Sequence, residues 1–417
     1  MTACGLDFGT SNSAIGVLRD GAPVLAPLEA GDTLMPSAIF FDFEADSRAV
    51  FGREAIAAYI DQREGRLMRS LKSILGSPLI DERTAIGRRR IPLTEVIEIY
   101  VKALKTRAEA FLGRELDQVV HGRPVRFVDG DDTADARAEA TLAQIARRAG
   151  FRDIAFVYEP IAAAYDYESH ATREETVLIA DIGGGTSDFT VIRIGPERRQ
   201  KPDRASDILA SAGIRIGGTD FDRLLSLKSV MPLLGLGTQL IEKDLPMPNA
   251  PYFDLATWAT INFVYTHATE REIATLAKGA REPEKVARLL KVIRRRLGHR
   301  IAFAVEDAKL ALSTEGATRL ALAFVEHDLE AHIARAEFDA AIAEKTGRLC
   351  RLARECIADA GLAPNAIDTI FLTGGSSRVP SVRHAIAAAA PQARLARGSD
   401  LLAVALGLTR DAARRFG

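Results

Sequence analysis

Two glycine-rich segments far apart in the chain follow the same pattern, and this duplication constrains the fold more than any other feature. Residues 5–18 read GLDFGTSNSAIGVL and residues 179–194 read IADIGGGTSDFTVIRI. Each runs from an apolar stretch through an aspartate and glycine to Thr-Ser, and then into a second apolar stretch. Apolar runs on both sides of a glycine turn predict a β-hairpin. A repeated hairpin predicts two lobes that each carry one copy.

The rest of the chain alternates between strand-length and helix-length patterns. With 417 residues, of which 47% are hydrophobic, the chain is long enough for two lobes with sizeable cores. Short apolar runs predict strands at residues 38–43, 125–128, 154–157, 208–214, 320–325 and 367–373. Apolar residues at three- and four-residue intervals predict helices at residues 133–149, 160–169, 283–312, 335–360 and 379–389. We therefore predict an α/β fold with mixed sheets.

Composition argues against several classes of partner. The 55 Lys and Arg residues against 56 Asp and Glu give a net charge of −1, so no overall field attracts nucleic acid or an anionic membrane. The start of the chain lacks the pattern of an export signal, and the alanine-rich residues 385–390 are too few to span a bilayer. Three unevenly spaced cysteines predict reduced thiols. We expect a cytoplasmic protein with no nucleic-acid, membrane or zinc partner.

The two turns have the chemistry of a phosphate site. Successive backbone amides in a glycine-rich turn converge on an anion, and the missing Cβ atoms let its oxygens approach. The aspartates before the turns, Asp7 and Asp181, would repel bare phosphate, which predicts a hydrated Mg²⁺ between carboxylate and phosphates. A third turn, at residues 372–378, follows a predicted strand and precedes a predicted helix, which suits it to the nucleoside. Two facing copies of the first turn would enclose a triphosphate from both sides.

Each turn also has a purely structural interpretation. A single glycine turn after a strand is far more often structural than functional. Three such turns in this order, two of them preceded by aspartate, are a much rarer combination. The chain contains no G-x-x-x-x-G-K-[ST], and its N-terminal turn is not G-x-G-x-x-G, which argues against the P-loop and Rossmann classes.

These motifs resemble those of the Hsp70 chaperone ATPase domain, within the superfamily that also contains actin and sugar kinases. GLDFGTSNS resembles the family's first phosphate motif, ADIGGGTSDF its second, and LTGGSSRVPSVR its nucleoside motif. Residues 70–76, SLKSILG, resemble the segment with the family's catalytic lysine, and residues 158–165, YEPIAAAY, resemble its Asn-Glu-Pro helix start. Residues 306–313, EDAKLALS, resemble its adenosine-contacting helix.

The resemblance implies a duplicated actin-like (ribonuclease H-like) ATPase fold, in which two lobes surround a central nucleotide cleft. Lobe I would comprise residues 1–172, with 37–95 as its peripheral subdomain and 390–417 returning to it. Lobe II would comprise residues 173–389, with 223–305 as its peripheral helical subdomain. The implied activity is a slow ATPase coupled to a change in conformation.

The resemblance also assigns roles to individual residues, with ATP or ADP, Mg²⁺ and K⁺ as implied ligands. Lys72 would contact the γ-phosphate and water, and Arg378 would stack on adenine. Without the resemblance, Lys72 reads as an exposed helical lysine and Glu159 as a helix cap. The catalytic candidates are Lys72, Glu159, Asp181 and Thr186, and the metal candidates are Asp7, Asp181 and Asp188. The nucleotide-binding candidates are Gly9, Thr10, Ser11, Asn12, Gly183, Gly184, Gly185, Gly217, Gly218, Glu306, Lys309, Ser313, Gly374, Gly375, Ser376, Arg378 and Asp400.

The chain departs from the family pattern in three places. The family's Leu-Gly-Gly-Glu-Asp-Phe-Asp segment appears as IGGTDFD at residues 216–222, which keeps the glycines and carboxylates. The family's switch strand matches only as GRPVRF at residues 122–127, with Pro124 and Arg126 as candidate interlobe relay residues. The sequence ends soon after the closing segment at 400–407, so we expect a nucleotide-binding domain alone, as in short YegD-like relatives, with any co-chaperone or client supplied in trans. Two other functions share the phosphate motifs and stay open: an MreB-type filament, and a superfamily phosphotransferase or exopolyphosphatase.

Overall fold

The two lobes contain sheets whose five main strands have the same order. The computed structural model describes residues 2–128, 131–168, 171–201, 204–397 and 402–416. The lobe I sheet consists, in spatial order, of β3 (Ala22–Leu25), β2 (Asn12–Arg19), β1 (Ala3–Phe8), β10 (Gln118–Arg123) and β11 (Asp153–Tyr158), and β4 (Met35–Pro36) pairs with β2. The lobe II sheet consists of β14 (Ile208–Ile214), β13 (Ser187–Ile194), β12 (Glu175–Ile182), β17 (Thr369–Thr373) and β18 (Arg394–Arg397).

The repeated hairpins occupy equivalent positions in the two sheets. β1 and β2 are antiparallel and place Asp7 opposite Ala14, while β12 and β13 are antiparallel and place Asp181 opposite Asp188. The first strand of each hairpin also pairs in parallel with a later strand, β1 with β10 and β12 with β17. The duplication predicted from the two glycine segments is therefore confirmed at the level of sheet topology.

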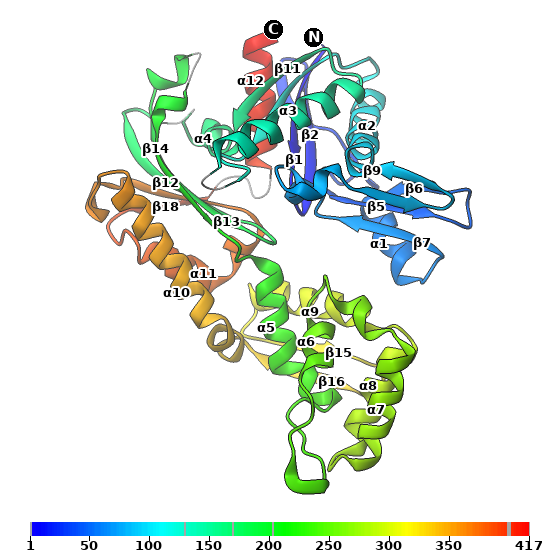
Figure 1. The fold of residues 1–417 in the computed structure, drawn as a ribbon. Helices are drawn as coiled ribbons and strands as arrows, with labels where there is room; N and C mark the ends of the chain where they lie inside the picture. The colour runs from blue at the N-terminus through cyan, green and yellow to red at the C-terminus, as the bar shows by residue number, and fades with distance from the viewer. Residues whose placement is uncertain (1, 129–130, 169–170, 202–203, 398–401, 417) are drawn as a thin grey trace.

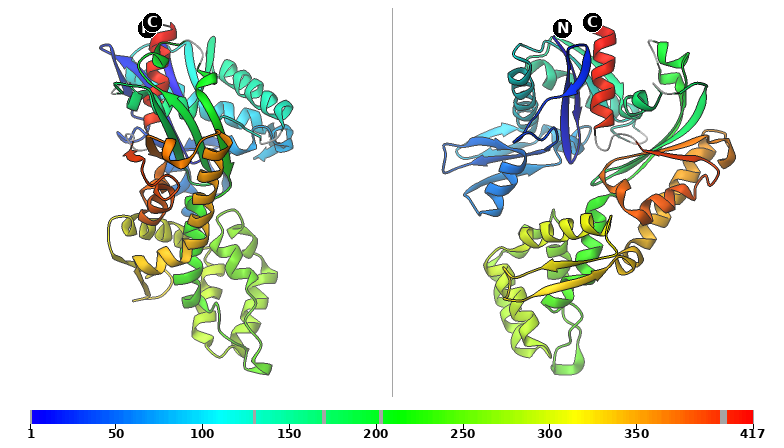
Figure 2. Two further views of the ribbon diagram at one scale, coloured as in Figure 1. Left: turned by 90° about the vertical axis from the view of Figure 1, so that its left-hand side faces the viewer. Right: turned by 180° about the vertical axis from the view of Figure 1, so that it is seen from behind.

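Helices cover both sheets and connect the lobes. α2 (Leu93–Leu112) and α3 (Asp132–Arg148) pack on the lobe I sheet, and α10 (Arg335–Asp359) and α11 (Pro380–Ala387) pack on the lobe II sheet. α4 (Glu159–Glu168) and α12 (Ala403–Phe416) lie between the two sheets, where they share a buried apolar cluster with β12 and β13 (Figure 2). Because α12 packs on β1 although it follows the lobe II strands, the two lobes are joined by crossed connections.

Small residues let α12 approach its neighbours closely. A Cβ atom at Gly407 would collide with the backbone of Ala162 on α4. On the other side of α12, Cβ atoms at Gly5 and Gly16 would collide with Thr409. Side chains here would push α12 away from α4, β1 and β2, so the glycines fix how closely α12 packs within lobe I.

The peripheral part of lobe I is a small sheet with one helix. β5 (Ala38–Asp42) pairs with β6 (Arg48–Phe51) and β7 (Gly65–Arg69), and α1 (Gly52–Ile60) packs against β5. Two short 3-10 helices follow, η1 (Leu71–Ile74) and η2 (Pro78–Asp81), and then the hairpin of β8 (Arg83–Ile86) and β9 (Arg89–Pro92). Residue Lys72 lies in the first of these 3-10 helices, directly after β7.

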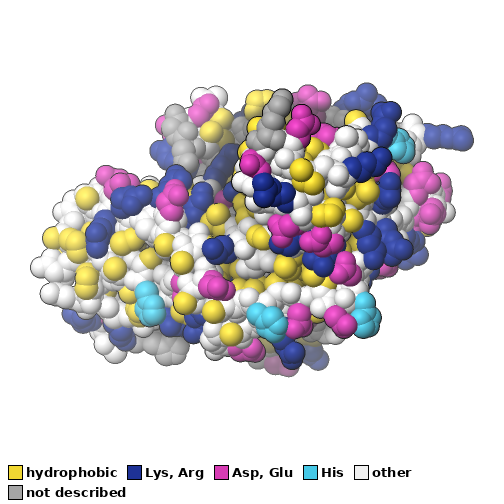
Figure 3. All heavy atoms as spheres, turned by 90° about the horizontal axis from the view of Figure 1, so that it is seen from below, with side chains coloured by type: hydrophobic (Ala, Val, Ile, Leu, Met, Phe, Trp, Pro, Cys, Tyr) yellow, Lys and Arg dark blue, Asp and Glu magenta, His cyan; other side chains and the backbone are white. Residues whose placement is uncertain are grey.

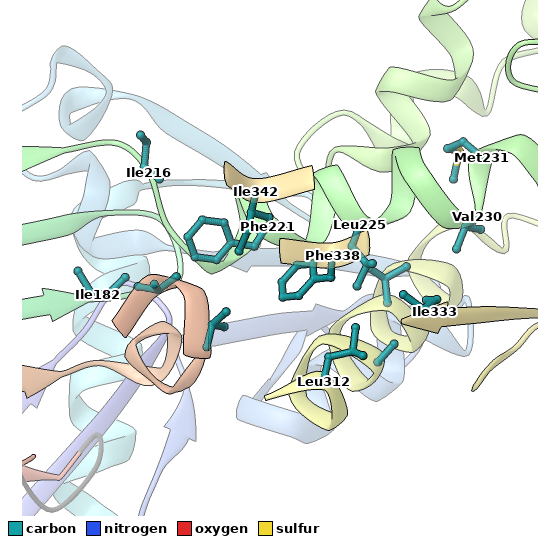
Figure 4. Packing of buried hydrophobic residues seen from close by; sticks show 14 of the residues in the cluster. Ile182, Ile216, Phe221, Leu225, Val230, Met231, Leu312, Ile333, Phe338 and Ile342 are labelled. Atoms are coloured by element: carbon teal, nitrogen blue, oxygen red, sulfur yellow. The ribbon is translucent and has the colours of Figure 1, made fainter. Parts of the chain in front are cut away.

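The peripheral part of lobe II is mostly helical and extends away from the sheets (Figure 1). Its helices are α5 (Gly218–Ser229), α6 (Ala250–Ala256), α7 (His267–Gly279), α8 (Pro283–Arg294) and α9 (Gly298–Leu312), beside the hairpin of β15 (Ala317–Ala321) and β16 (Glu330–Ala334). One continuous apolar core links this part to the sheet. It begins near the sheet and extends into the peripheral part through Ile182, Ile216, Phe221, Leu225, Phe338, Leu312 and Ile333 (Figure 4).

Three predicted elements differ from the structure. The single helix predicted over residues 283–312 is two helices, α8 and α9, separated by a turn in which Arg296 has φ 49°. The strand predicted at 125–128 is loop, because the pairing strand is the earlier β10. The strand predicted at 320–325 ends at Ala321, and the chain then turns, with the Val325 N–H donating to the Leu322 carbonyl. An apolar run therefore indicates a buried segment more reliably than it indicates the strand with which that segment pairs.

The face of the molecule seen from below is mixed in charge. On the face seen in Figure 3, acidic and basic side chains are interspersed with hydrophobic and neutral ones, and no single kind covers it. Within the part of the chain that the structure describes, no helix combines the length and the apolar character needed to cross a membrane.

Candidate functional site

The two glycine turns face each other across the lobes. A Cβ atom at Gly184 would collide with the hydroxyl oxygen of Ser11, which belongs to the other lobe. The lobe II turn is closed by the Gly183 N–H, which donates to the Thr186 carbonyl over 2.9 Å. The lobe I turn is braced by Ser37, whose hydroxyl donates to the Gly9 carbonyl (2.6 Å) and whose N–H donates to the Ser11 carbonyl (2.8 Å).

A second pair of glycines forms a cradle beneath the lobe II turn. The Gly218 N–H donates to the Gly183 carbonyl (3.0 Å), and a Cβ atom at Gly217 would lie 2.6 Å from Gly184 backbone atoms. The Ser376 hydroxyl also donates to the Gly183 carbonyl, over 2.9 Å, which ties the third glycine turn to the second. Above this layer, a Cβ atom at Gly185 would have no neighbour within 4 Å. Backbone packed below and open space above suit an anion that sits directly on the amides.

A buried cation lies among the acidic side chains between the turns. The Lys72 ammonium donates to Oε1 of Glu159, the first residue of α4, and these side chains are 10% and 17% exposed. Asp7 and Asp181 are close enough to Lys72 for their charges to influence it. The structure therefore brings together the lysine and three carboxylates that sequence reasoning had placed in the site.

This group titrates in an unusual range. Burial and the neighbouring Glu159 and Asp181 raise the pKa of Asp7 to about 8, although Lys72 opposes the shift. Burial, Asp188 and Glu159 raise the pKa of Asp181 to about 7. Burial lowers the pKa of Lys72, but the attraction of Glu159, Asp7 and Asp181 outweighs it, so that its pKa is raised. Carboxylates crowded together in a partly dry site resist ionising together, and a divalent cation would relieve that cost.

The other end of the cleft is built on α5, α9 and the third glycine turn. Lys309 of α9 is buried and forms an ion pair with Asp222 of α5 at 2.8 Å. Ser313 donates to the Lys309 carbonyl, while Glu306 is exposed. Gly374 has φ 79°, and a Cβ atom there would collide with Asp181, so the third turn also abuts the acidic group.

The predicted residues fall into three groups by position. Those at the turns and the acidic centre converge, and Lys309 and Ser376 lie together beside Gly218. Thr186, Asp188 and Arg378 are exposed at the rim, and Asp400 lies outside the described residues. Among the described residues, no group of three or more His, Cys, Asp or Glu side chains is arranged to hold a metal ion directly.

Sequence reasoning missed two residues that support the site. Asp222, whose pKa burial raises to about 6, holds Lys309 in place. It belongs to the segment IGGTDFD at residues 216–222, so its carboxylate next to the glycine pair was a usable signal. Ser37 holds the first turn, and it carries no local signal because it acts through backbone carbonyls far away in sequence.

The two peripheral parts contact each other directly. Tyr59 of α1 donates to Oδ1 of Asn262 over 2.6 Å, and the Tyr59 ring meets the His299 ring edge-on at 4.7 Å. The guanidinium of Arg69 lies 4.4 Å from the ring centroid of Trp258, which also contacts His299. Burial lowers the pKa of His299 to about 4, helped by Arg69, so the ring is neutral at physiological pH. The cleft is therefore bridged on this side by a cluster of aromatic rings with one guanidinium stacked on Trp258.

The duplicated sheets, the crossed helices between them and the facing glycine turns define the class of the protein. It has the actin-like ATPase fold, in which two related lobes enclose a cleft. The family model for Hsp70 protein matches residues 3–228 and 290–409. This chain therefore belongs to the Hsp70 family. The unmatched residues between the two blocks, 229–289, lie in the peripheral part of lobe II and include Trp258 and Asn262.

Proposed function

We propose that the chain binds and hydrolyses ATP in the cleft between its lobes and that closure around the nucleotide drives a chaperone-related function. The observation that carries this proposal is the convergence of two glycine turns, one from each lobe, on the buried Lys72–Glu159 ion pair. A ligand gripped by both turns couples its own binding to the relative position of the lobes.

In the proposed reaction, the oxygen of a water molecule bonds to the γ-phosphorus as the bond to the bridging oxygen breaks. The bridging electron pair stays on ADP, and the proton of the water passes through a carboxylate to orthophosphate. Lys72 would stabilise the charge on the transferred group, and Glu159 and Asp181 would orient the water. Thr186 would add a hydroxyl from the rim of the second turn.

A metal ion would complete the charge balance of this site. Asp7, Asp181 and Asp188 would hold a hydrated Mg²⁺ through its water molecules, and Mg²⁺ supplies charge neutralisation of the phosphates when bound. K⁺ is a further candidate for the same oxygen-rich region. At the other end, Glu306, Lys309 and Ser313 would face adenosine, with Arg378 as a stacking cation.

Two other functions share the phosphate turns. An MreB-type filament protein would pellet in the presence of ATP, and a phosphotransferase or exopolyphosphatase would need an acceptor or polyphosphate for turnover. The Lys72–Glu159 pair and the Lys309–Asp222 pair favour the chaperone-type ATPase. A client or co-chaperone in trans is the proposed target of the lobe movement.

A matched pair of glycine variants tests the nucleotide site. Gly184→Ala introduces a Cβ atom against Ser11 of the opposite lobe, whereas Gly279→Ala, at the end of α7, introduces one where nothing lies within 4 Å. We expect calorimetry to give at least a tenfold loss of Mg-ATP affinity for Gly184→Ala and no change for Gly279→Ala. Equal affinities for both variants would show that nucleotide does not bind between the turns.

A further inference from the structure

A fully buried histidine, His121, lies on β10, an interior strand of the lobe I sheet. Its ring nitrogen Nδ1 is 2.8 Å from the carbonyl oxygen of Gly122. Because a carbonyl oxygen can only accept a hydrogen bond, Nδ1 carries the proton of the neutral ring and Nε2 keeps its lone pair. Nε2 is buried and has no hydrogen-bond partner among the residues that the structure describes. The ring therefore offers an acceptor to any donor that comes within reach.

The backbone of β10 runs next to the ion pair at the acidic centre. A Cβ atom on Gly122, the residue after His121, would lie 3.5 Å from Oε1 of Glu159. The same oxygen accepts a hydrogen bond from the Lys72 ammonium. His121 is thus one residue along the strand from a backbone position in contact with this pair.

The packing on one face of the sheet leads from the imidazole to the same lysine. Phe156 of β11 is the register partner of His121, and the two ring centroids are 5.8 Å apart. Phe156 packs against the apolar cluster that contains Leu71 and Leu75, which lie on either side of Lys72 in the chain. The segment that carries the lysine and the ring of His121 therefore share one packed region.

The Lys72 ammonium needs more than one acceptor. It has three N–H groups in a side chain that is 10% exposed, and one of them donates to Glu159. In the proposed reaction, Lys72 faces the γ-phosphate and Glu159 orients the water, so this ion pair has to loosen. A buried donor that loses its acceptor costs free energy, which favours a second acceptor nearby.

A neutral imidazole suits this role better than another carboxylate. Burial lowers the pKa of His121 to about 4; the hydrogen bond to the Gly122 carbonyl opposes the shift, and the charge of Lys72 adds to it. The ring is therefore neutral at physiological pH. A neutral acceptor satisfies an N–H group without cancelling the positive charge, and that charge stabilises the transferred phosphoryl group.

We propose that His121 is a positioning residue for Lys72, and that its Nε2 accepts a hydrogen bond from the ammonium when the γ-phosphate draws the ammonium away from Glu159. The proposal rests on the ATPase function proposed above. His121 contacts neither the nucleotide nor the attacking water, and it acts on the reaction through Lys72 alone.

Two variants of His121 separate the acceptor from the shape of the ring. His121→Phe keeps a planar ring and removes Nε2, whereas His121→Gln keeps an acceptor oxygen at a similar reach. In single-turnover experiments, His121→Phe should slow hydrolysis about tenfold, the equivalent of one hydrogen bond to a charged group, with Mg-ATP affinity unchanged. His121→Gln should stay within about threefold of the wild-type rate. In a Lys72→Met background, His121→Phe should cause no further loss, because the group that it positions is gone.

Nitrogen NMR gives a readout that does not depend on activity. In protein with ¹⁵N-labelled histidine, the Nε2 resonance of His121 should be that of an unprotonated nitrogen, and its absence from the spectrum of His121→Gln identifies it. Addition of a non-hydrolysable ATP analogue with Mg²⁺ should move this resonance to lower frequency, as expected for a nitrogen that gains a hydrogen bond. Lys72→Met, with the same ligand, should show no such movement.

The outcomes distinguish the positioning role from the ATPase function. Wild-type hydrolysis in His121→Phe, or an equal loss in the wild-type and Lys72→Met backgrounds, would overturn the positioning role and leave the ATPase function intact. An Nε2 resonance that bound nucleotide does not move would do the same. If the wild type neither binds nor hydrolyses Mg-ATP, the proposed function fails, and the positioning role fails with it.

Discussion

Replacing Lys72 is the most informative single change, because its ammonium is embedded among carboxylates. Lys72→Met keeps the apolar stem of the side chain and removes the ammonium group that donates a hydrogen bond to Glu159. Asp7 and Asp181 lose the same neighbouring cation, whose charge partly offsets the rise of both carboxyl pKa values in the wild type. We therefore expect the acidic centre of the variant to take up protons, which leaves fewer ionised carboxylates to attract Mg²⁺.

The size of the effect follows from the role assigned to the cation. A charge that acts on the transition state is worth roughly 2.7–4 kcal/mol, the loss seen when a positioned donor is removed from an oxyanion site. At about 1.36 kcal/mol per factor of ten, hydrolysis should fall by roughly a hundredfold or more. Mg-ATP affinity should stay within a few-fold of wild type, since the turns and not the lysine supply most of the phosphate contacts. Stability should fall by less than the roughly 3–5 kcal/mol for breaking a fully buried pair, because the carboxyls can protonate.

Single-turnover hydrolysis and calorimetric binding, measured on the same preparation, separate these effects. Lys102→Met is the control, since Lys102 is exposed on α2 and outside the cleft. Wild-type hydrolysis rates in Lys72→Met would remove Lys72 from the reaction, and a parallel loss of affinity and rate would assign it to ground-state binding.

Three further results are expected. The raised pKa values of Asp7 (about 8) and Asp181 (about 7) mean that the folded, metal-free protein holds protons that the unfolded chain has lost, so its stability should fall as pH rises toward 8. For the same reason, Mg-ATP binding should release protons, and its affinity should increase from about pH 6 to 9. A flat affinity profile would contradict this. Trp258 is the chain's one tryptophan, so its fluorescence should change when the cleft opens. Arg69→Ala removes a contact worth about 1 kcal/mol and should therefore speed ADP release about fivefold. An unchanged rate would argue against this contact as a barrier to ADP release. Gly407→Val should destabilise the protein by about 2–3 kcal/mol or more in urea titrations by forcing α12 from α4, and unchanged stability would mean that the packing of α12 adapts freely.

Much of the fold could be read from the sequence because its strongest signals are local. A glycine turn between apolar runs specifies a hairpin within a few residues, and both hairpins form as predicted. The break between α8 and α9 was not visible, because the apolar spacing continues across it and only the backbone at Arg296 changes. The loop at 125–128 was mistaken for a strand because a short apolar run carries no information about its pairing partner.

The candidate site was predictable in its turns and much less so in its supports. Lys72 and Glu159 meet from different parts of lobe I, and their spacing in sequence says nothing about this; the resemblance to the Hsp70 family supplied it. Ser37 and Asp222 act through a backbone carbonyl and through another side chain, respectively, so their roles depend on three-dimensional packing. The Arg69–Trp258 contact joins two peripheral parts, and Trp258 lies outside the matched family segments, so no motif could have indicated this contact.

The central claim is that the two glycine turns grip one nucleotide between the lobes. A crystal structure of the chain with a non-hydrolysable ATP analogue and Mg²⁺ tests it most directly. The account predicts the β- and γ-phosphates between residues 9–12 and 183–186, the Lys72 ammonium at the γ-phosphate, and adenosine between α9 and the Gly374 turn. A nucleotide bound elsewhere, or phosphates that contact only one of the two turns, would contradict it.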